Sequence, residues 1–261
     1  MNQAKFRKSN EHKQNIIKHQ ETDSTRLNKY IGDSGFCSRR DADVFIAAGK
    51  VTIDGVKAVI GTKVYAGQVV KIDKKVITPS CKKVYILLNK PTGIICTNDL
   101  NTKNNIRVYI NYPDLIYPIG RLDKDSSGII LLTNDGDIVN KILRAENAHE
   151  KEYIVTLNKD ISDEFVNKMK NGVLIYNQVA QKDQITSKCH IEKTDNRTFR
   201  IILKQGLNRQ IRRMCEVLGY NVLSLKRIRI MNIRVGNLNQ GEWRFLTDKE
   251  LMVLNDSINS K

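Results

Sequence analysis

One stretch of the sequence limits the possible folds more than any other: Tyr117–Asp137, which reads YPIGRLDKDSSGIILLTNDGD. Its apolar run Ile129–Leu132 is short and bounded by turn-forming residues, which predicts a strand buried on both faces. Asp137 is then expected to cap a helix over 138–144. Asp123 lies just before the predicted strand, and a carboxylate on a rigid support suits a nucleophile or general base. The alternative is that Asp123 only caps the loop and forms a surface ion pair with the arginine two residues before it.

The balance of charge restricts the possible partners. The 261 residues include 44 Lys and Arg against 28 Asp and Glu, a formal net charge of +16. A folded chain this basic repels itself unless it meets a polyanion, so nucleic acid is the first expectation and an anionic membrane surface is the alternative. No apolar run approaches the ~20 residues of a spanning helix, and the start lacks the apolar segment of a signal peptide. We therefore expect a cytoplasmic protein that does not enter a membrane.

Neither a metal nor a cofactor is expected. The five cysteines are scattered without a CxxC pair, which favours reduced core residues over disulfides or zinc ligands. The sequence also contains no GxGxxG, no P-loop and no cluster of metal-ligating residues.

Composition divides the chain into three parts. Residues 1–24 are polar and basic with few apolar side chains, which predicts a flexible tail, although residues 10–18 offer a helix that RNA would order. Residues 25–75 have the pattern of a small separate module. Pro79 lies in a stretch of low apolar content, so we expect the boundary there and a larger domain over 80–261.

The 25–75 module is predicted to hold two helices and a hairpin. Apolar residues spaced three and four apart over 27–31 predict the first helix, and the capping box Ser38–Asp41 begins the second. Asp54-Gly55 predicts a hairpin on a type I′ turn. The basic residues of the module are expected to contact phosphates rather than only water: Arg26, Lys29, Arg39, Arg40 and Lys50.

This module resembles the S4 domain (α-L), an RNA-binding unit first known from a ribosomal protein. The resemblance rests on Arg26–Ile31, Gly35–Ala42, Gly49–Val51 and Asp54-Gly55. It implies binding to structured RNA and no more than that.

The larger domain has the mixed pattern of an α+β fold. Strands are expected over 84–88, over 198–203 and, as one long strand with a basic edge, over 222–235. Tyr153 lies on a further strand, either as a core residue or as the lining of a polar cleft. The helix 209–218 carries three arginines on one turn, which repel each other unless carboxylates or phosphates lie nearby.

Three motifs in this order resemble those of the pseudouridine synthases that follow an S4 domain: Gly120–Asp123, Lys151–Tyr153 and Asn208–Met214. The resemblance implies a small N-terminal S4 domain and then a mixed, mostly antiparallel sheet with flanking helices and a central cleft. Within the family, the closest type, named F, modifies large-subunit ribosomal RNA. The implied activity is isomerisation of uridine to pseudouridine in 23S ribosomal RNA, with transfer RNA as a further candidate substrate. A monomer is the default expectation.

The resemblance also implies roles for single residues. Asp123 is the catalytic carboxylate, which either attacks C1′ or takes a proton from C2′, and the sequence leaves both routes open. Arg212 pairs with it and keeps it ionised, Tyr153 stacks on the target base, and Arg121 fills the space that the flipped nucleotide leaves. The remaining predicted site residues form the apolar wall of the base pocket (Leu122 and Leu225) or contact RNA (Lys90, Arg121, Arg209, Arg213, Arg227 and Arg229).

Two other functions fit part of the pattern. A non-catalytic RNA-binding protein would share the basic module, but it has no use for a desolvated carboxylate with matched tyrosine and arginine motifs. An N-glycosidase would share the first step and release free uracil, so product analysis separates it. The order of the motifs favours the complete isomerisation.

Overall fold

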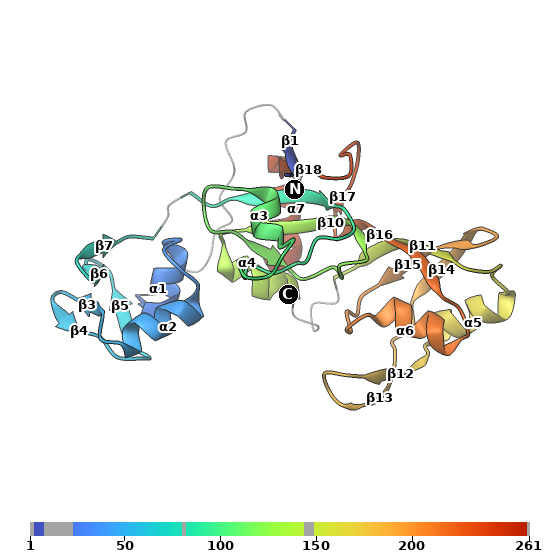
Figure 1. Ribbon diagram of the computed structural model, residues 1–261, viewed down its shortest axis with the longest axis horizontal. Helices are drawn as coiled ribbons and strands as arrows, with labels where there is room; N and C mark the ends of the chain where they lie inside the picture. Colours follow the sequence, from blue (N-terminus) through green and yellow to red (C-terminus); the bar gives the residue numbers. More distant parts are fainter. Residues whose placement is uncertain (1–2, 8–22, 80–81, 144–148, 260–261) are drawn as a thin grey trace.

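The computed structural model describes residues 3–7, 23–79, 82–143 and 149–259. A small module that includes residues 23–77 lies at one end of the molecule, and a sheet domain with a second lobe forms the rest (Figure 1). The protein is α+β, as predicted. No helix within these described ranges is long and apolar enough to cross a membrane.

The N-terminal module has the helices and hairpin that its sequence predicts. Its helices are α1 (Leu27–Asp33) and α2 (Arg39–Ala47), and its strands are β2 (Ser24–Arg26), β3 (Val51–Ile53), β4 (Val56–Lys57), β5 (Lys63–Tyr65), β6 (Val70–Ile72) and β7 (Lys75–Ile77). The capping box is confirmed, because the backbone N–H of Asp41 donates to Ser38 Oγ at 3.2 Å. The hairpin is confirmed too, since Asp54 and Gly55 both have positive φ, 51° and 87°, between β3 and β4.

The larger domain is built on a ten-stranded sheet. Its strands are β1 (Lys5–Phe6), β8 (Tyr85–Lys90), β9 (Tyr117–Ile119), β10 (Ser127–Thr133), β11 (Lys151–Leu157), β14 (His190–Asp195), β15 (Thr198–Leu203), β16 (Val222–Ile230), β17 (Ile233–Arg234) and β18 (Glu242–Phe245). The order is β1-β18-β8-β10-β16-β11-β15-β14, with β9 also on β10 and β17 also on β16. Among the described strands, β1 with β18 and β10 with β16 pair in parallel, and the other pairs are antiparallel. The sheet is therefore mixed and mostly antiparallel, as expected.

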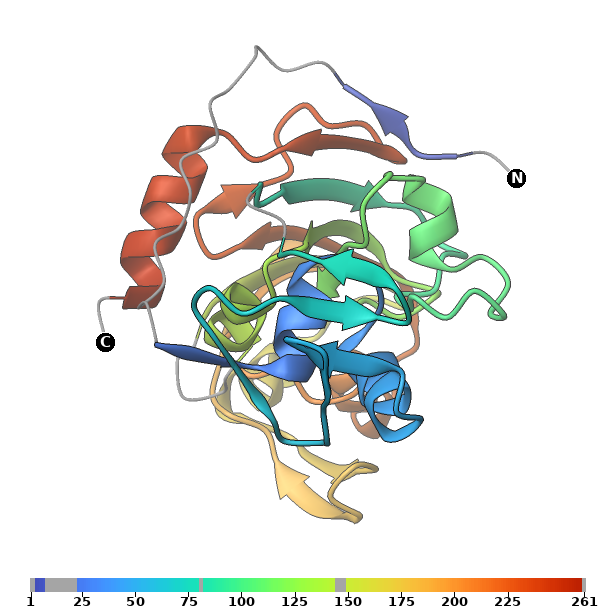
Figure 2. The ribbon, with the colours of Figure 1, turned by 90° about the vertical axis from the view of Figure 1, so that its left-hand side faces the viewer.

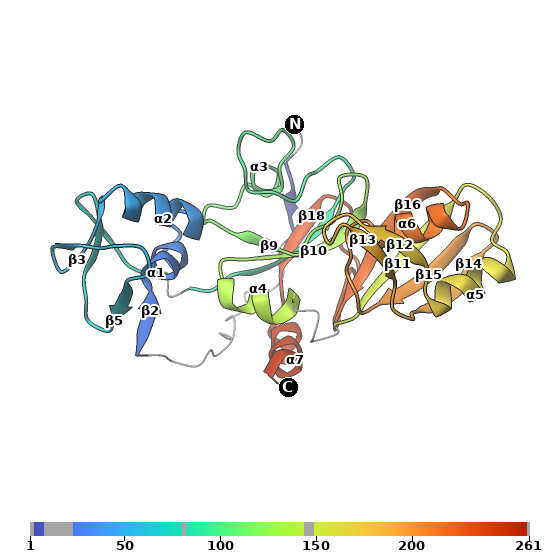
Figure 3. The ribbon, with the colours of Figure 1, turned by 90° about the horizontal axis from the view of Figure 1, so that it is seen from below.

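β10 is the central strand of this domain and contains the apolar run that was predicted to be buried. Each residue of Ile129–Leu132 is at most 1% exposed. α4 (Gly136–Leu143) and α7 (Asp248–Asn259) pack on one face of the sheet, and α3 (Ile106–Ile110) covers the other (Figure 3).

A second lobe is built on the end of the sheet that β11, β15 and β14 form. α5 (Asp163–Asn171) and α6 (Gln210–Val217) pack against β11 and β15 around a core that includes Phe165, Phe199 and Met214. A separate hairpin of β12 (Leu174–Asn177) and β13 (Lys182–Ile185) projects beside α6 (Figure 1).

Two predicted elements differ from the structure. The segment 222–235 is not one strand, because Met231 adopts a φ of 51° and β17 folds back on β16. α4 begins at Gly136, so Asp137 lies inside the helix instead of capping it. Asp135 takes that position, since its Oδ1 accepts the backbone N–H of Asp137 at 3.3 Å.

The predicted tail 1–24 is ordered at residues 3–7, where β1 lies beside β18 at the sheet edge (Figure 2). The Phe6 ring lies 4.6 Å from that of Trp243, centroid to centroid. The tail prediction was wrong here because it weighed only local apolar content, whereas strand addition uses the backbone: the N–H of Arg7 donates to Trp243 O at 2.9 Å. The alternative of a helix over 10–18 falls outside the described residues.

The N-terminal module meets the larger domain through ion pairs at the start of α4. Lys29 Nζ lies 3.0 Å from an Asp137 oxygen and 2.6 Å from Asp33, and Arg39 Nη2 lies 3.8 Å from Asp137. A Cβ on Gly136 would lie 2.9 Å from Arg39 Nη2, so glycine leaves room for the guanidinium. Asp137 thus joins the two parts of the protein.

Candidate active site

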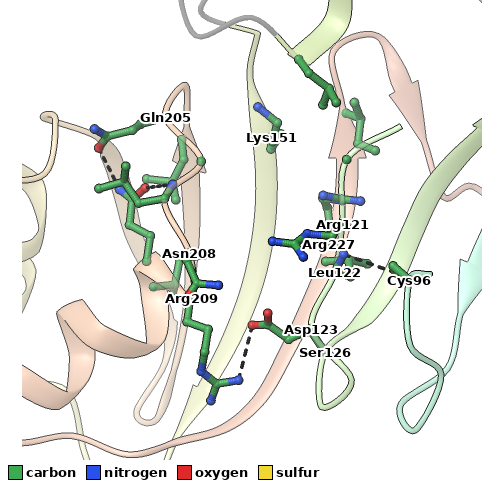
Figure 4. A pocket seen from close by; sticks show the side chains of 18 of the residues that line it. Cys96, Arg121, Leu122, Asp123, Ser126, Lys151, Gln205, Asn208, Arg209 and Arg227 are labelled. Carbon is green, nitrogen blue, oxygen red and sulfur yellow. Dashed lines mark hydrogen bonds and ion pairs between the residues drawn. The ribbon is translucent and has the colours of Figure 1, made fainter. Parts of the chain in front are cut away.

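A cleft of about 960 Å³ lies between the central sheet and the second lobe. The loop 117–126 lines one wall, the segment 203–212 lines the opposite wall, and β11 and β16 contribute residues between them (Figure 4). The three sequence motifs meet here, because Asp123, Tyr153 and Arg212 all line the cleft.

Asp123 lies on the loop between β9 and β10. Gly120, with a φ of 75°, turns the chain out of β9, and the Ser126 N–H donates to Asp123 O at 3.1 Å just before β10 begins. The Asp123 side chain is 31% exposed, so the carboxylate is partly buried and still open to the cleft. Among the described residues that line the cleft, it is the only carboxylate.

A close approach of two strands fixes the base of this loop. Gly128 of β10 pairs with Arg227 of β16, and a Cβ at Gly128 would lie only 2.1 Å from Arg227 O. Its φ of 105° also favours glycine. Gly128 therefore allows β10 and β16 to pack closely, which places the loop of Asp123 near Arg227.

Arg209, rather than Arg212, faces the carboxylate. Arg209 Nη1 lies 3.7 Å from Asp123 Oδ2 (Figure 4). Arg212 instead donates from Nη1 to Val222 O at 3.1 Å and from Nη2 to Asp125 O at 3.0 Å. The predicted pairing of Arg212 with Asp123 is therefore corrected.

The correction has its cause at the start of α6. The sequence pattern treats Arg209 as the first helical residue, on one face with Arg212. In the structure Arg209 has a φ of 51° and precedes the helix, which begins at Gln210, so helical spacing does not predict its direction. Through Nη1 and Nη2, Arg212 connects β16 with the loop that carries Asp123.

A β-bulge in β16 determines which of its residues line the cleft beside Tyr153. Tyr153 pairs with Arg227 while the preceding Glu152 pairs with Arg229, so β16 has one extra residue at this point. Leu225 and Arg227 consequently line the cleft together with Tyr153, whereas Arg229 contacts Glu152. Leu122 and Leu225, the predicted apolar wall, are 6% and 7% exposed and both line the cleft.

Lys90 and Arg227, which were predicted to contact RNA, are buried. Lys90 is 0% exposed, and its Nζ donates to Pro91 O at 2.8 Å and Ile94 O at 3.0 Å. The prediction was wrong because β8 continues to Lys90 instead of ending at residue 88. Burial lowers the pKa of Lys90 to about 8. Arg227 is 3% exposed, so neither side chain reaches the outer surface.

Arg229 and Arg213 both contact groups of the protein itself, and their RNA contacts stay predictions. Arg229 Nε lies 2.6 Å from Glu152 Oε2. Burial alone would raise the pKa of Glu152, but hydrogen bonds from Arg229 and a second arginine hold it below its usual value. Arg213 donates to Tyr176 O at 2.6 Å and to Asn208 Oδ1 at 3.0 Å, and so ties β12 to the start of α6.

The other predicted RNA contacts divide by exposure. Lys29 and Arg39 are half-buried in the ion pairs with Asp137. The remaining basic residues are exposed on the N-terminal module or at the cleft: Arg26, Arg40, Lys50, Arg121 and Arg209.

Sequence reasoning missed Lys151 as a site residue. It lines the cleft, and its Nζ donates to His149 O at 3.2 Å. Burial, and then the nearby Arg227, lower its pKa. The available signal was its place two residues before Tyr153 on a strand, since alternate strand residues share a face.

The described part of the chain contains no group of three His, Cys, Asp or Glu side chains placed to hold a metal ion. Four cysteines, Cys37, Cys96, Cys189 and Cys215, are free thiols, and Cys81 lies outside the described residues.

Comparisons with known proteins agree with the order of the two domains. The sequence profile of the S4 domain matches residues 25–70, and that of the RNA pseudouridylate synthase family matches residues 84–217. The chain is 54% identical to the dual-specificity RNA pseudouridine synthase RluF of Salmonella typhi, over 88% of this chain and 78% of the relative. It is 32% identical to the ribosomal large subunit pseudouridine synthase B of Bacillus subtilis, over 87% of this chain and 93% of the relative.

A solved structure gives the same result for the fold. The chain superposes on a crystal structure described as a pseudouridylate synthase with a TM-score of 0.64 and 28% identity, over 88% of this chain and 99% of the other. The family match spans the loop of Asp123, the strand of Tyr153 and the start of α6, the three segments that meet in the cleft. The chain therefore belongs to the RNA pseudouridylate synthase family and is an RNA-modifying isomerase with an N-terminal S4 domain.

Proposed function

We propose that the enzyme converts uridine to pseudouridine in large-subunit (23S) ribosomal RNA, with Asp123 as its catalytic carboxylate. The observation that carries the proposal is the placement of Asp123 as the only carboxylate among the described residues of a basic cleft. The name of the Bacillus subtilis relative supports ribosomal RNA as the substrate. The words "dual-specificity" in the name of the Salmonella typhi relative support a second RNA substrate, for which we propose transfer RNA.

One carboxylate is sufficient for this isomerisation. The bond between N1 of uracil and C1′ of ribose breaks, and its electron pair leaves with the base. Asp123 either forms a bond to C1′ or removes a proton from C2′. The base then turns until C5 faces C1′, and a C5–C1′ bond forms. The first step at the ribose is reversed, C5 loses its proton, and N1 gains one, so no oxidant or reductant is consumed.

Apolar and aromatic residues suit the reaction because the target base must leave its stack. Tyr153 is half-buried in the cleft, where its ring offers a stacking surface for a flipped uracil. Leu122 and Leu225 exclude water from the same space. The exposed Arg121 lies at the cleft, where it is placed to fill the gap that the flipped nucleotide leaves in the RNA.

Two arginines hold the carboxylate in place by different means. Arg209 supplies a positive charge 3.7 Å from Asp123, which attracts the carboxylate and orients it. Arg212 fixes the loop through Asp125 O and so acts on Asp123 indirectly. In this proposal, Arg209 replaces Arg212 as the charge partner that the family resemblance implied.

The proposal is tested by mapping pseudouridine in ribosomal and transfer RNA from cells with and without the gene. We expect at least one uridine of 23S ribosomal RNA to lose its modification in the deletion strain. The parent gene should restore it, and a gene carrying Asp123→Asn should not. Unchanged 23S ribosomal RNA would exclude the proposed substrate, and restoration by the Asn variant would exclude the proposed role of Asp123.

A further inference from the structure

Arg227 combines deep burial with a place in the cleft. It is 3% exposed and still belongs to the residues that line the cleft. Its Nε donates to Ile129 O of the central strand at 2.8 Å. Its Nη2 is buried and meets no acceptor among the described residues. Because buried donors in folded proteins nearly always have partners, a buried guanidinium that lines the cleft and keeps an unused donor is suited to meet an acceptor on the substrate.

The guanidinium of Arg227 is held in a fixed position before any substrate binds. The close approach of Gly128 fixes the Arg227 backbone against β10, and the hydrogen bond to Ile129 O fixes Nε. The planar guanidinium then has little freedom to choose where Nη2 points. A donor fixed in advance needs no reorganisation during the reaction, which is the property that stabilises developing charge most effectively.

The surroundings of Arg227 favour an anion. Burial lowers the pKa of Lys90 to about 8, and among its charged neighbours Asp123 raises that pKa while Arg227 lowers it. Burial, and then Arg227, lower the pKa of Lys151. Cations thus gather in this part of the cleft, where Asp123 is the only carboxylate among the described lining residues. The local excess of positive charge is balanced when a negative group enters.

We propose that the Arg227 guanidinium donates a hydrogen bond to the uracil ring after the base has left C1′, and that it stabilises the negative charge of the detached base. This inference rests on the proposed reaction at Asp123, although it holds for either route. In both routes the electron pair of the C1′–N1 bond leaves with the base, and the charge spreads over N1 and the carbonyl oxygens. The pair returns to C1′ when the C5–C1′ bond forms, so Arg227 neither gives nor takes a proton.

The position of Arg227 favours the base over an RNA phosphate as its partner. Arg227 is paired in register with Tyr153, the residue proposed to stack on the flipped uracil. Phosphates remain on the outside of a nucleic acid, where exposed cations at the cleft such as Lys204 are available. A phosphate contact would affect RNA affinity and its salt dependence, whereas a contact to the detached base affects only the rate of the bound complex.

The test compares Arg227→Met and Arg227→Lys with the parent enzyme. The substrate is total RNA from cells lacking the gene, labelled with tritium at C5 of uridine, because pseudouridine formation releases that hydrogen. This substrate contains the natural target whichever RNA it is, so the result does not depend on the proposed 23S specificity. We expect Arg227→Met to lower turnover at saturating RNA by on the order of 10²–10³-fold, with RNA affinity within about threefold of the parent. Arg227→Lys keeps the charge and should retain more turnover.

A matched control and a rescue separate chemistry from stability. Arg229→Met removes a guanidinium from the same strand without removing one from the cleft. It should lower the melting temperature and leave the turnover of the folded enzyme close to that of the parent. Ethylguanidinium at millimolar concentration should restore part of the turnover of Arg227→Ala, because the truncated side chain leaves room for the lost donor. Parental turnover of folded Arg227→Met would overturn the proposal, as would a loss confined to RNA affinity. Unfolding of both Arg227 variants would also overturn it, since Arg227 would then be a structural residue.

Discussion

The S4 domain and the cleft use the same basic side chains in opposite surroundings. Arg26, Arg40 and Lys50 of the S4 domain are exposed, whereas Arg227 at the cleft is only 3% exposed. An exposed cation contributes to RNA binding mainly by releasing counterions, so its contribution depends on salt. A buried cation lost its water when the protein folded, and it acts at close range on the groups beside it. We therefore expect the exposed cations of the S4 domain to affect RNA affinity and the buried Arg227 to affect turnover, a distinction that the net charge of +16 does not make.

The largest expected effect is on turnover, from Asp123→Asn. The amide has nearly the same shape as the carboxylate but is neither nucleophilic nor basic, so turnover should fall on the order of 10³-fold or more. RNA affinity and melting temperature should stay close to those of the parent. Asp125→Asn is the matched control, because Asp125 lies exposed on the same loop and does not line the cleft. Residual turnover within about tenfold of the parent would contradict the role of Asp123 as the catalytic carboxylate.

A second prediction concerns how the two arginines hold Asp123. Arg212 joins two backbone carbonyls, a task that needs the fork of a guanidinium, so Arg212→Lys should lose about as much turnover as Arg212→Met, roughly 10- to 100-fold. Arg209 acts by its charge at 3.7 Å, so Arg209→Lys should keep most of the parental turnover and Arg209→Met should not. Turnover at saturating RNA measures both pairs. Rescue by lysine at 212 and not at 209 would restore the assignment that the sequence motif implied.

The third prediction concerns the exposed side of the comparison. Replacing Arg26, Arg40 and Lys50 together by Gln should weaken RNA binding and reduce the slope of log affinity against log salt by up to about 2–3. Turnover at saturating RNA should stay within about twofold of the parent, because none of the three lines the cleft. An unchanged salt slope would show that the S4 domain does not hold the phosphates through these residues.

The smallest expected effect is on stability, from Lys90→Met. Burial lowers the Lys90 pKa from 10.5 to about 8, so between these values the unfolded chain binds more protons than the folded one. The cost of burying the charged ammonium group is fully present below pH 8. The free energy of unfolding of the parent should therefore rise by up to about 3 kcal/mol as the pH rises from 8 to 10.5. Lys90→Met should lack this gain, which urea unfolding at several pH values measures. If the stability of the two proteins changes with pH in the same way, folding does not lower the pKa of Lys90.

Local sequence chemistry predicted the elements that depend on neighbours in the chain. The buried strand Ile129–Leu132, the capping box at Ser38 and the turn at Asp54-Gly55 each follow from a few adjacent residues. The addition of β1 to the sheet depends on β18, far along the chain, and the pattern of residues 1–24 contains no trace of it. Likewise, the reversal before β17 depends on a positive φ at Met231, a residue type that rarely adopts one.

The candidate site was predictable as a set of residues but not as a set of contacts. Motif order places Asp123, Tyr153 and Arg212 together, and all three line one cleft. Which arginine faces Asp123 depends on the left-handed backbone of Arg209, and the fate of Lys90 depends on where a strand ends. Such details follow from tertiary packing, so a motif alone does not predict them.

β1 is the first described strand, yet it can join the sheet only after β18 has been synthesised. β1 pairs with β18, and the Arg7 side chain donates to the carbonyl of Asn237, 230 positions along the chain. During synthesis the S4 domain, whose strands pair within residues 24–77, emerges complete long before β18 exists. We therefore expect folding to proceed from an early S4 domain to a late closure of the sheet edge. A nascent chain stopped before residue 242 should contain a folded S4 domain, while β8 has β10 as a partner and still lacks β18.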